Sequence, residues 1–168
     1  MNVNVNLKFL RNAREIYGDG NPDNAAGGLL PSTMFSVGVD LRACLEPDGS
    51  LEVIIAPGER FAVGSGISIA PPEPCPGTPA VAGFVYSRSG LGAKHGLVVA
   101  QGVGVIDPDY RGEIIVWLLN TSKKEIVLHQ GDRMAQLVFL NYYQPVFNVV
   151  DELGSTSRGA GGFGHTGK

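Results

Sequence analysis

Apolar and β-branched residues along this chain gather in short runs, and glycine, proline, asparagine or aspartate separates most of them. Such runs predict β-strands, and no window keeps the 3.6-residue period of a long helix. The expected strands cover Val3–Leu10, Phe35–Leu41, Leu51–Ile55, Phe61–Ile69, Val81–Tyr86, Leu97–Ala100, Gly104–Ile106, Ile114–Leu119, Ile126–Leu128, Met134–Leu140 and Val146–Val149. One or two helical turns are expected around Gly90–His95. The pattern predicts an all-β sandwich or barrel.

Composition supports one folded domain followed by a tail. The chain has 168 residues, 43% of them hydrophobic, which suffices for one domain with a core. We therefore expect a single β domain over residues 1–153. Residues 154–168 are rich in glycine, which is typical of a flexible tail. Because this tail carries Arg158 and Phe163, it could instead close as a lid over an anionic aromatic ligand.

Charge and rare residues argue against several classes of function. The formal net charge is −3, from 13 basic and 16 acidic residues, which argues against a nucleic-acid partner. Cys44 and Cys75 form no metal-ligand spacing, the three histidines form no zinc pair, and reduced thiols are favoured over a disulfide. The chain shows no signal-peptide core and no membrane-spanning stretch, so we expect a cytoplasmic protein without a membrane partner.

The segment SRSGLGAKHG, residues 87–96, is the first candidate binding segment. An expected strand runs into a serine, an arginine and two glycines, and a helical turn follows. Backbone amides at such a turn can converge on an anion, and Arg88 adds a planar, permanently charged donor suited to phosphate. Taken alone, the segment fits an ordinary strand-to-helix turn with a surface arginine equally well.

The segment QGVGVIDPDYRGEI offers a turn and a carboxylate. Leu97–Ala100 and Val103–Ile106 are expected to form a β-hairpin with a tight turn at Gln101–Gly102. The backbone at a hairpin tip can hydrogen-bond the edge of a flat base. Asp107 ends the second strand and could hold and deprotonate a water molecule, although an aspartate before proline usually binds its own backbone.

Two further polar residues lie within apolar strands. In GDRMAQLVF, Gly131–Asp132 predicts a turn, and Gln136 belongs to the apolar run Met134–Phe139, where a buried polar side chain needs a partner. In SVGVDLRA, Asp40 alternates with apolar neighbours and is therefore expected on the opposite face. A cross-sheet hydrogen bond for Gln136, and a solvated face or an ion pair for Asp40, are the common roles of such residues.

Taken in order, SVGVDLRA, SRSGLGAKHG, GVGVIDPDYRGEI, GDRMAQLVF and RGAGGFGHTG resemble the five sequence motifs of the trimeric dUTPases. The resemblance runs from about Phe35 to the C-terminus, and it is specific because the motifs are long and stand in the family's order. It implies a homotrimer of jelly-roll-like β subunits whose active sites lie between subunits. It also implies hydrolysis of dUTP to dUMP and diphosphate, which lowers dUTP and supplies dUMP for thymidylate synthesis.

The resemblance assigns substrate contacts to the matching residues. Along the triphosphate would lie Arg88, Ser89 and Gly90. Uracil would be held by the segment from Gln101 to Asp107, which includes Val105 and Ile106, chiefly through its backbone, with Ile115 close by. Tyr110 would pack under the deoxyribose, where a 2′-hydroxyl would collide. Arg158 would grip the γ-phosphate, and Phe163 would stack on uracil as the tail closes.

The resemblance also implies how the reaction proceeds. Asp107 would orient and activate the water that attacks the α-phosphorus. Gln136 would support the phosphate chain or its hydrated metal, and Asp40 would organise its neighbours through an arginine. The cofactor would be Mg²⁺, held mainly by the substrate's phosphates with no direct protein ligand. Together with Arg88 and Arg158, it would neutralise the leaving diphosphate.

The sequence departs from the family pattern in a few places. Gln101 stands where bacterial members carry asparagine, and Tyr86 stands where proline is usual before SRSG. The stretches 18–32 and 71–80 are longer than a minimal member needs.

Two other readings compete with a dUTPase. A dCTP deaminase shares the subunit fold and the motifs around SRSGLG and IDPDYRG. It would need a glutamate seven positions after Tyr110, and Trp117 stands there. A non-catalytic trimer that binds nucleotides or proteins would be expected to lack Asp107, Arg88 or the tail, and all are present.

Overall fold

The computed structural model describes residues 3–18, 29–45, 49–75 and 80–162, and most of its regular structure is β-strand. The strands are β1 (Asn6–Phe9), β2 (Val39–Arg42), β3 (Glu52–Ile55), β4 (Arg60–Gly64), β5 (Ile67–Ala70), β6 (Ala80–Tyr86), β7 (Leu97–Val99), β8 (Val103–Ile106), β9 (Ile115–Asn120), β10 (Ile126–His129) and β11 (Arg133–Tyr142). Two five-residue helical turns accompany them, α1 (Ala13–Tyr17) and η1 (Leu91–His95). The all-β prediction is confirmed, and neither turn is long and apolar enough to cross a membrane.

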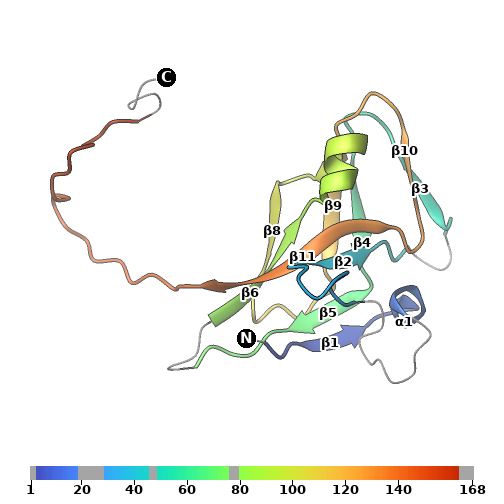
Figure 1. Ribbon diagram of the computed structural model, residues 1–168, viewed down its shortest axis with the longest axis horizontal. Coiled ribbons are helices and arrows are strands. Elements are labelled where there is room, and N and C mark those ends of the chain that lie inside the picture. Colours follow the sequence, from blue (N-terminus) through green and yellow to red (C-terminus); the bar gives the residue numbers. More distant parts are fainter. Residues whose placement is uncertain (1–2, 19–28, 46–48, 76–79, 163–168) are drawn as a thin grey trace.

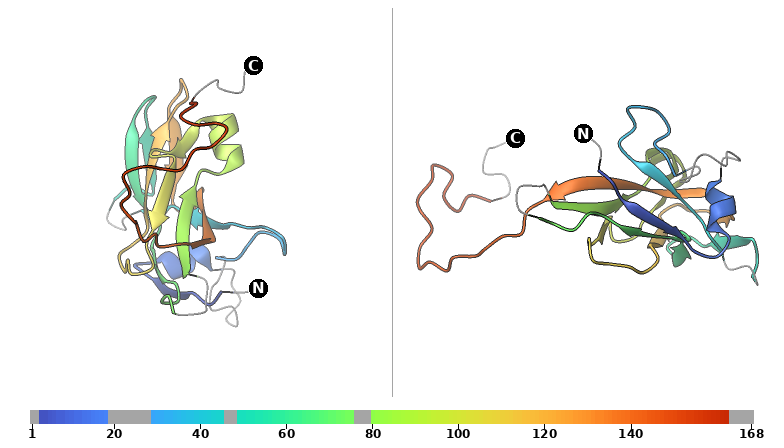
Figure 2. Two further views of the ribbon diagram at one scale, coloured as in Figure 1. Left: turned by 90° about the vertical axis from the view of Figure 1, so that its left-hand side faces the viewer. Right: turned by 90° about the horizontal axis from the view of Figure 1, so that it is seen from below.

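The strands form antiparallel sheets arranged around the long strand β11 (Figure 1). The largest sheet has the order β2-β11-β6-β8, and a three-stranded sheet has the order β4-β9-β7. Two-stranded sheets, β1-β5 and β10-β3, complete the body. The segment after β11 extends away from the body, as Figure 1 and the right-hand view of Figure 2 show.

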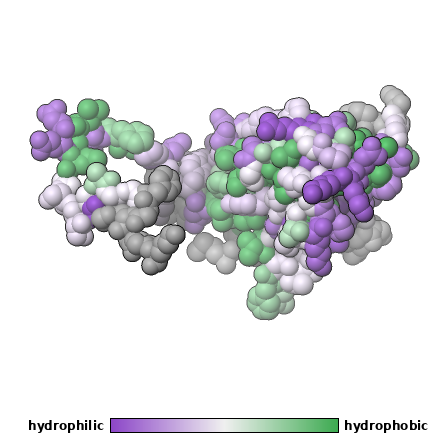
Figure 3. Space-filling view, turned by 90° about the horizontal axis from the view of Figure 1, so that it is seen from above, coloured by the Kyte–Doolittle hydropathy of each residue, from purple (hydrophilic) through white to green (hydrophobic). Residues whose placement is uncertain are grey.

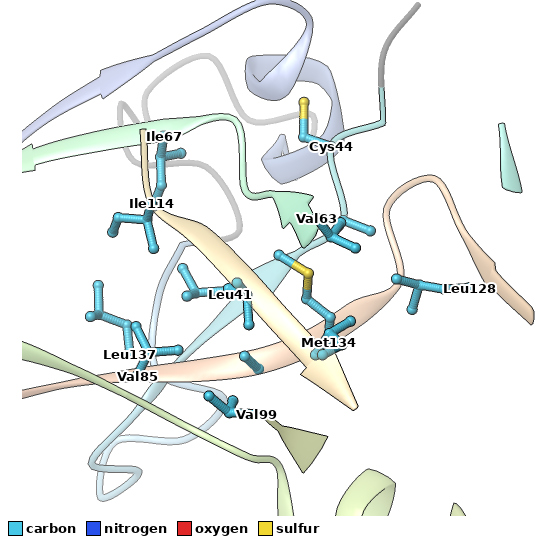
Figure 4. Close-up of a cluster of buried hydrophobic side chains, with 14 of the residues drawn as sticks. Leu41, Cys44, Val63, Ile67, Val85, Val99, Ile114, Leu128, Met134 and Leu137 are labelled. Carbon is cyan, nitrogen blue, oxygen red and sulfur yellow. The ribbon is translucent and has the colours of Figure 1, made fainter. Parts of the chain in front are cut away.

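The core receives side chains from the two larger sheets (Figure 4). Leu41, Val85 and Leu137 come from the four-stranded sheet, and Val63 and Val99 from the three-stranded one. Each is buried to within a few per cent, and burying an aliphatic side chain contributes about 1.5–3 kcal/mol to stability. The apolar faces of the two sheets pack together in this core, and that packing fixes the strands that carry the candidate site.

One expected strand is interrupted. Phe61–Ile69 was expected to be continuous, but the chain turns at Ser65–Gly66 and divides it into β4 and β5, which belong to different sheets. Gly66 has φ +70°, a left-handed conformation that side chains disfavour. A Cβ atom there would lie 2.7 Å from the Cys44 sulfur, so the corner also needs the space that glycine leaves.

Three other expectations differ from the structure. β2 begins at Val39 rather than Phe35, and Val146–Val149 is extended but forms no strand in the described part of the chain. Helix α1 was not predicted, although its buried residues Ala13 and Tyr17 stand four positions apart, as on one face of a helical turn. The segment Val146–Val149 lacks strand pairing because none of the described strands lies beside it.

Candidate active site

The sheet register brings Asp40 and Gln136 together. Asp40 in β2 pairs with Gln136 in β11, which pairs in turn with Tyr86 in β6, so the three residues form one row across the sheet. Residues paired in this way have their side chains on the same face. Asp40 is half-buried on the face opposite the buried Leu41, as its alternation with apolar neighbours predicted.

Asp40 holds two arginines through its two carboxylate oxygens. Arg88 Nε donates to Asp40 Oδ1 at 2.6 Å, and Arg133 Nη1 donates to Oδ2 at 3.2 Å. The Asp40 side chain is only 17% exposed, so its ion pair with the mostly buried Arg88 is partly shielded from water, whereas Arg133 is half exposed. The structure thus supplies the arginine through which Asp40 was expected to organise the site. The second arginine, Arg133, was missed, because a charge at the first residue of a strand has no distinctive pattern.

Gln136 is oriented by the backbone beside Arg88. Its Nε2 donates to the Ser87 carbonyl at 3.0 Å. The amide oxygen lies on the other side, next to Gly38, the residue before β2. A Cβ atom at position 38 would lie 2.9 Å from that oxygen. The expected hydrogen-bond partner of this polar side chain is therefore found, and a small residue at 38 keeps its oxygen accessible.

These residues border a cleft of about 470 Å³. Its lining combines cationic, hydroxyl and amide groups: Ser32, Ser36, Val37, Gly38, Asp40, Arg88, Ser89, Gly90, Gln136 and Val138. The lining therefore includes all the residues expected beside phosphates other than Arg158, namely Arg88, Ser89, Gly90 and Gln136. Arg88 is the cationic residue of this lining; its Nε donates to Asp40, its Nη1 donates to the Arg133 carbonyl at 3.3 Å, and a guanidinium has further N–H donors for an anion.

The turn that presents Arg88 is fixed on both sides. The Gly92 N–H donates to the Arg88 carbonyl at 2.8 Å, and η1 follows where a helical turn was predicted. Ser87 Oγ accepts the Val99 N–H at 2.8 Å, which ties the turn to β7. These hydrogen bonds fix the backbone at Arg88, so the guanidinium starts from a defined position.

The segment after η1 differs from the predicted hairpin. The tight turn is present, since the Gly102 N–H donates to the Val99 carbonyl at 3.0 Å and Gly102 has φ +83°. The predicted pairing is wrong, because β7 pairs with β9 and β8 pairs with β6. The turn therefore carries the chain from one sheet to the other. β8 becomes an edge strand within the described sheets, and an edge strand offers unpaired N–H and C=O groups to a flat ligand.

Asp107 follows β8 and is exposed. Its backbone carbonyl accepts the Tyr110 N–H at 3.1 Å, which closes the turn around Pro108. Among the described residues, nothing donates a hydrogen bond to the Asp107 carboxylate, so the side chain does not bind its own backbone as the alternative reading proposed. Asp107 belongs to a second cleft of about 570 Å³, lined by Pro74, Ala82, Phe84, Val105, Asp107, Pro108, Asp109, Tyr142 and Gln144.

The two clefts lie apart on one chain. β6 and β8 are antiparallel, with Tyr86 paired to Val103 and Gly83 paired to Ile106. Arg88 follows one end of this ladder and Asp107 follows the other. Tyr86 and Gly83 are three residues apart in β6, and this distance along the strand alone separates the two ends of the ladder by about 10 Å, at ~3.3 Å per residue. A single copy therefore does not bring the expected phosphate ligand and the expected base together.

The remaining expected site residues lie around these clefts. Tyr110 is 44% exposed, and Ile115 is 52% exposed on β9. Gln101 is exposed in the turn before β8. Arg158 lies in the tail, where its Nε donates to the Gly161 carbonyl at 2.9 Å, and it is not among the residues that line either cleft. Phe163 lies outside the described residues.

Together, fold and site define a small antiparallel β protein with an arginine in the lining of one cleft and an exposed carboxylate at the other. The dUTPase family model matches residues 29–167. Proteins named deoxyuridine 5′-triphosphate nucleotidohydrolase are similar to this chain. The one from Psychromonas ingrahamii is 44% identical over 137 residues, 82% of this chain and 85% of that protein. The one from Desulfitobacterium hafniense is 44% identical over 136 residues, 81% and 84% of the two chains. The chain therefore belongs to the dUTPase family, as its motifs predicted.

Solved structures agree on the fold. The dUTPase of Staphylococcus bacteriophage 80alpha with dUpNHpp has a TM-score of 0.71 and 21% identity, over 98% of this chain and 99% of that one. The dUTPase of phage phi11 of S. aureus has a TM-score of 0.68 and 19% identity, over 91% and 99% of the two chains. These likenesses confirm the expected jelly-roll-like β fold.

Proposed function

We propose that this protein hydrolyses dUTP to dUMP and diphosphate by attack of water on the α-phosphorus. The observation that carries the proposal is the exposed Asp107 carboxylate at the end of edge strand β8. A general base must keep an oxygen open to the water that it deprotonates, and the described residues donate nothing to this carboxylate. The names of the relatives at 44% identity support the same reaction.

The Arg88 cleft would hold the triphosphate. Arg88, fixed by Asp40, would donate to phosphate oxygens, and Ser89 and Gly90 would line the chain of phosphates beside it. Positive charge placed before the reaction stabilises the negative charge that moves onto the leaving diphosphate. Arg158 of the tail would add a second cation at the γ-phosphate, and Phe163 would stack on the base.

The edge of β8 would read the base. Backbone groups from Gln101 to Asp107, among them those of Val105 and Ile106, would pair with uracil, with Ile115 beside them. A backbone acceptor that meets uracil N3–H would meet a lone pair in cytosine, and such a mismatch can reject an analogue by roughly 10⁴-fold. Tyr110 would lie under the deoxyribose and exclude a 2′-hydroxyl.

The proposal includes a homotrimer with sites between copies. The separation of Arg88 from Asp107 supports it, because the substrate would meet the two residues on different copies. Exposed apolar side chains support it as well. Trp117 is 50% exposed on β9, the central strand of its sheet, and Phe147 in the segment that follows β11 is 84% exposed. Figure 3 shows hydrophobic residues in the segment that stands off the body. Such surfaces are normally covered by another chain.

Magnesium is the cofactor in this proposal. Both Asp40 oxygens accept hydrogen bonds from arginines, so this carboxylate of the cleft is already engaged. The residues present fit an ion carried by the triphosphate, with the Gln136 amide oxygen facing the same cleft. Bound Mg²⁺ would neutralise charge on the phosphates. A phi11 dUTPase mutant has been described with a structural Mg(II) ion.

Diphosphate release from dUTP with Mg²⁺ tests the proposed function. The purified protein should release diphosphate from dUTP at least roughly 10³-fold faster than from dCTP, because the base contacts depend on hydrogen-bond polarity. The Asp107→Asn variant, prepared in the same way, controls for contaminating phosphatases. Equal release by the wild type and by this variant would overturn the proposal.

A further inference from the structure

A second ion pair lies beneath the loop that carries Tyr110. Arg11 Nη1 donates to Glu113 Oε2 at 2.8 Å, and Arg11 Nη2 donates to Oε1. The Gly66 N–H also donates to Glu113 Oε1, at 2.7 Å. The two side chains are 23% and 15% exposed, so water screens the pair only in part. The hydrogen bonds to Glu113 raise the pKa of Arg11 above its ordinary value.

The backbone around this pair is shaped to receive it. Gly64 leaves the space for the two charged groups, because a Cβ atom there would lie 2.8 Å from Arg11 Nη2. Arg11 itself has φ +50°, the one non-glycine residue with positive φ in the described chain. This conformation costs about 1–2 kcal/mol for a residue with a side chain. Glycine would adopt it without strain, so the guanidinium itself is what this position requires.

Glu113 also holds the ring of Tyr110 through its main chain. The Tyr110 hydroxyl donates to the Glu113 carbonyl at 3.0 Å. The ring lies against Gly112, where a Cβ atom would come within 2.5 Å of the Tyr110 Cζ. The Tyr110 N–H donates to the Asp107 carbonyl at 3.1 Å. A continuous set of hydrogen bonds therefore leads from Arg11 to the tyrosine ring and on to Asp107.

We propose that Arg11 and Glu113 are positioning residues that fix Tyr110 and thereby set the preference for deoxyribose over ribose. The inference rests on the proposed function, in which Tyr110 excludes the 2′-hydroxyl. A steric wall rejects an extra hydroxyl only while it cannot retreat. The ion pair anchors Glu113 to the Gly64–Gly66 corner, and Glu113 keeps the ring in place. The N-terminal segment, which precedes the part matched by the family model, thus acquires a role in substrate choice.

The ratio of kcat/KM for UTP to that for dUTP measures this role. Arg11→Met should raise the ratio by roughly tenfold, while kcat for dUTP changes less than about threefold, because the loosened wall admits a bulkier sugar. Glu113→Gln keeps an acceptor for the Gly66 N–H and should raise the ratio less. Arg11→Lys, which restores a positive charge, should recover part of the discrimination.

A double variant shows whether the two positions act by one route. Tyr110→Phe removes the hydroxyl that bonds to the Glu113 carbonyl and should raise the same ratio. Arg11→Met combined with Tyr110→Phe should raise it no further than the larger single effect, because both changes release the same ring. Effects that multiply would mean that Arg11 does not act through Tyr110, and would overturn the inference.

Tyr17→Phe is the matched control for loss of stability. Tyr17 accepts the Arg42 N–H at 2.8 Å, so this change loosens the same N-terminal segment and leaves Arg11 and Glu113 in place. It should lower the thermal midpoint and leave the UTP/dUTP ratio unchanged. An unchanged ratio in Arg11→Met, or an equal rise in Tyr17→Phe, would overturn the inference. Failure of the wild type to hydrolyse dUTP would instead reject the proposed function.

Discussion

Arg88 and Asp107 follow neighbouring strands of one sheet but stand at opposite ends of their shared ladder, because β6 and β8 run antiparallel. Asp40 further fixes Arg88 on its side of the sheet at 2.6 Å. In the proposed function, a triphosphate bound to Arg88 would therefore receive its attacking water from the Asp107 of another copy. This relationship makes assembly part of the proposed chemistry.

Asp107→Asn should abolish most turnover and preserve binding. The amide keeps the shape of the side chain but cannot accept the proton of the attacking water. We expect kcat to fall by roughly 10²-fold or more, with little change in affinity for a non-hydrolysable dUTP analogue. Stopped-flow or steady-state diphosphate release and calorimetric titration measure the two quantities. Turnover close to that of the wild type would end the assignment of Asp107 as the base.

Asp40→Ala should weaken substrate binding more than it slows the chemical step. The change leaves Arg88 and Arg133 without their shared carboxylate, and Arg88 then loses its fixed position. We expect KM for dUTP to rise by about tenfold or more. Asp132→Asn is the control, because this exposed carboxylate binds the His129 N–H outside the cleft and should leave KM unchanged. Equal KM values for Asp40→Ala and the wild type would contradict the role of Asp40.

The sugar preference should respond to the space around Tyr110. Tyr110→Ala removes the ring and should admit UTP better relative to dUTP. Gly112→Ala is a finer test, since its Cβ would come within 2.5 Å of the Tyr110 Cζ and must displace the ring. Both variants should raise the UTP/dUTP ratio of kcat/KM by roughly tenfold. If neither ratio moves, another residue excludes the 2′-hydroxyl.

Removal of residues 154–168 should separate folding from activity. In the described part of the tail, the hydrogen bonds of Arg158 are exchanged with Gly161 of the same tail, so little of the body's stability depends on this arginine. The truncated protein should keep its thermal midpoint and lose most of its kcat/KM, because the γ-phosphate loses a cation and the base loses Phe163. Phe163→Ala should reproduce part of that loss. Full activity without these residues would restore the reading of a plain flexible tail.

Local patterns predicted much of the fold. Alternation of apolar and polar residues located most strands, and it placed Asp40 on the face opposite Leu41. Alternation did not locate the corner inside Phe61–Ile69, for which the pattern predicts one strand. Only Gly64 and Gly66, on either side of Ser65, could have indicated the corner between β4 and β5.

Long-range pairing could not be predicted in the same way. A tight turn at Gly102 favours a hairpin locally, yet β7 and β8 gain more partners by joining β9 and β6. The contact between Arg11 and Glu113 spans 102 positions and has no sequence signature at all. Two arginines could each have been the partner expected for Asp40, and the structure shows that it holds both Arg88 and Arg133.

A mixed-trimer experiment tests the composite site most directly. Arg88→Gln and Asp107→Asn are each expected to be nearly inactive alone. Co-expressed with different affinity tags and purified through both, they form mixed trimers in which one interface joins an intact Arg88 to an intact Asp107. Diphosphate release from dUTP by these trimers should recover to about one third of the wild-type rate, one working site in three. Mixed trimers no more active than their parents would show that both residues act within one copy, and would contradict the account.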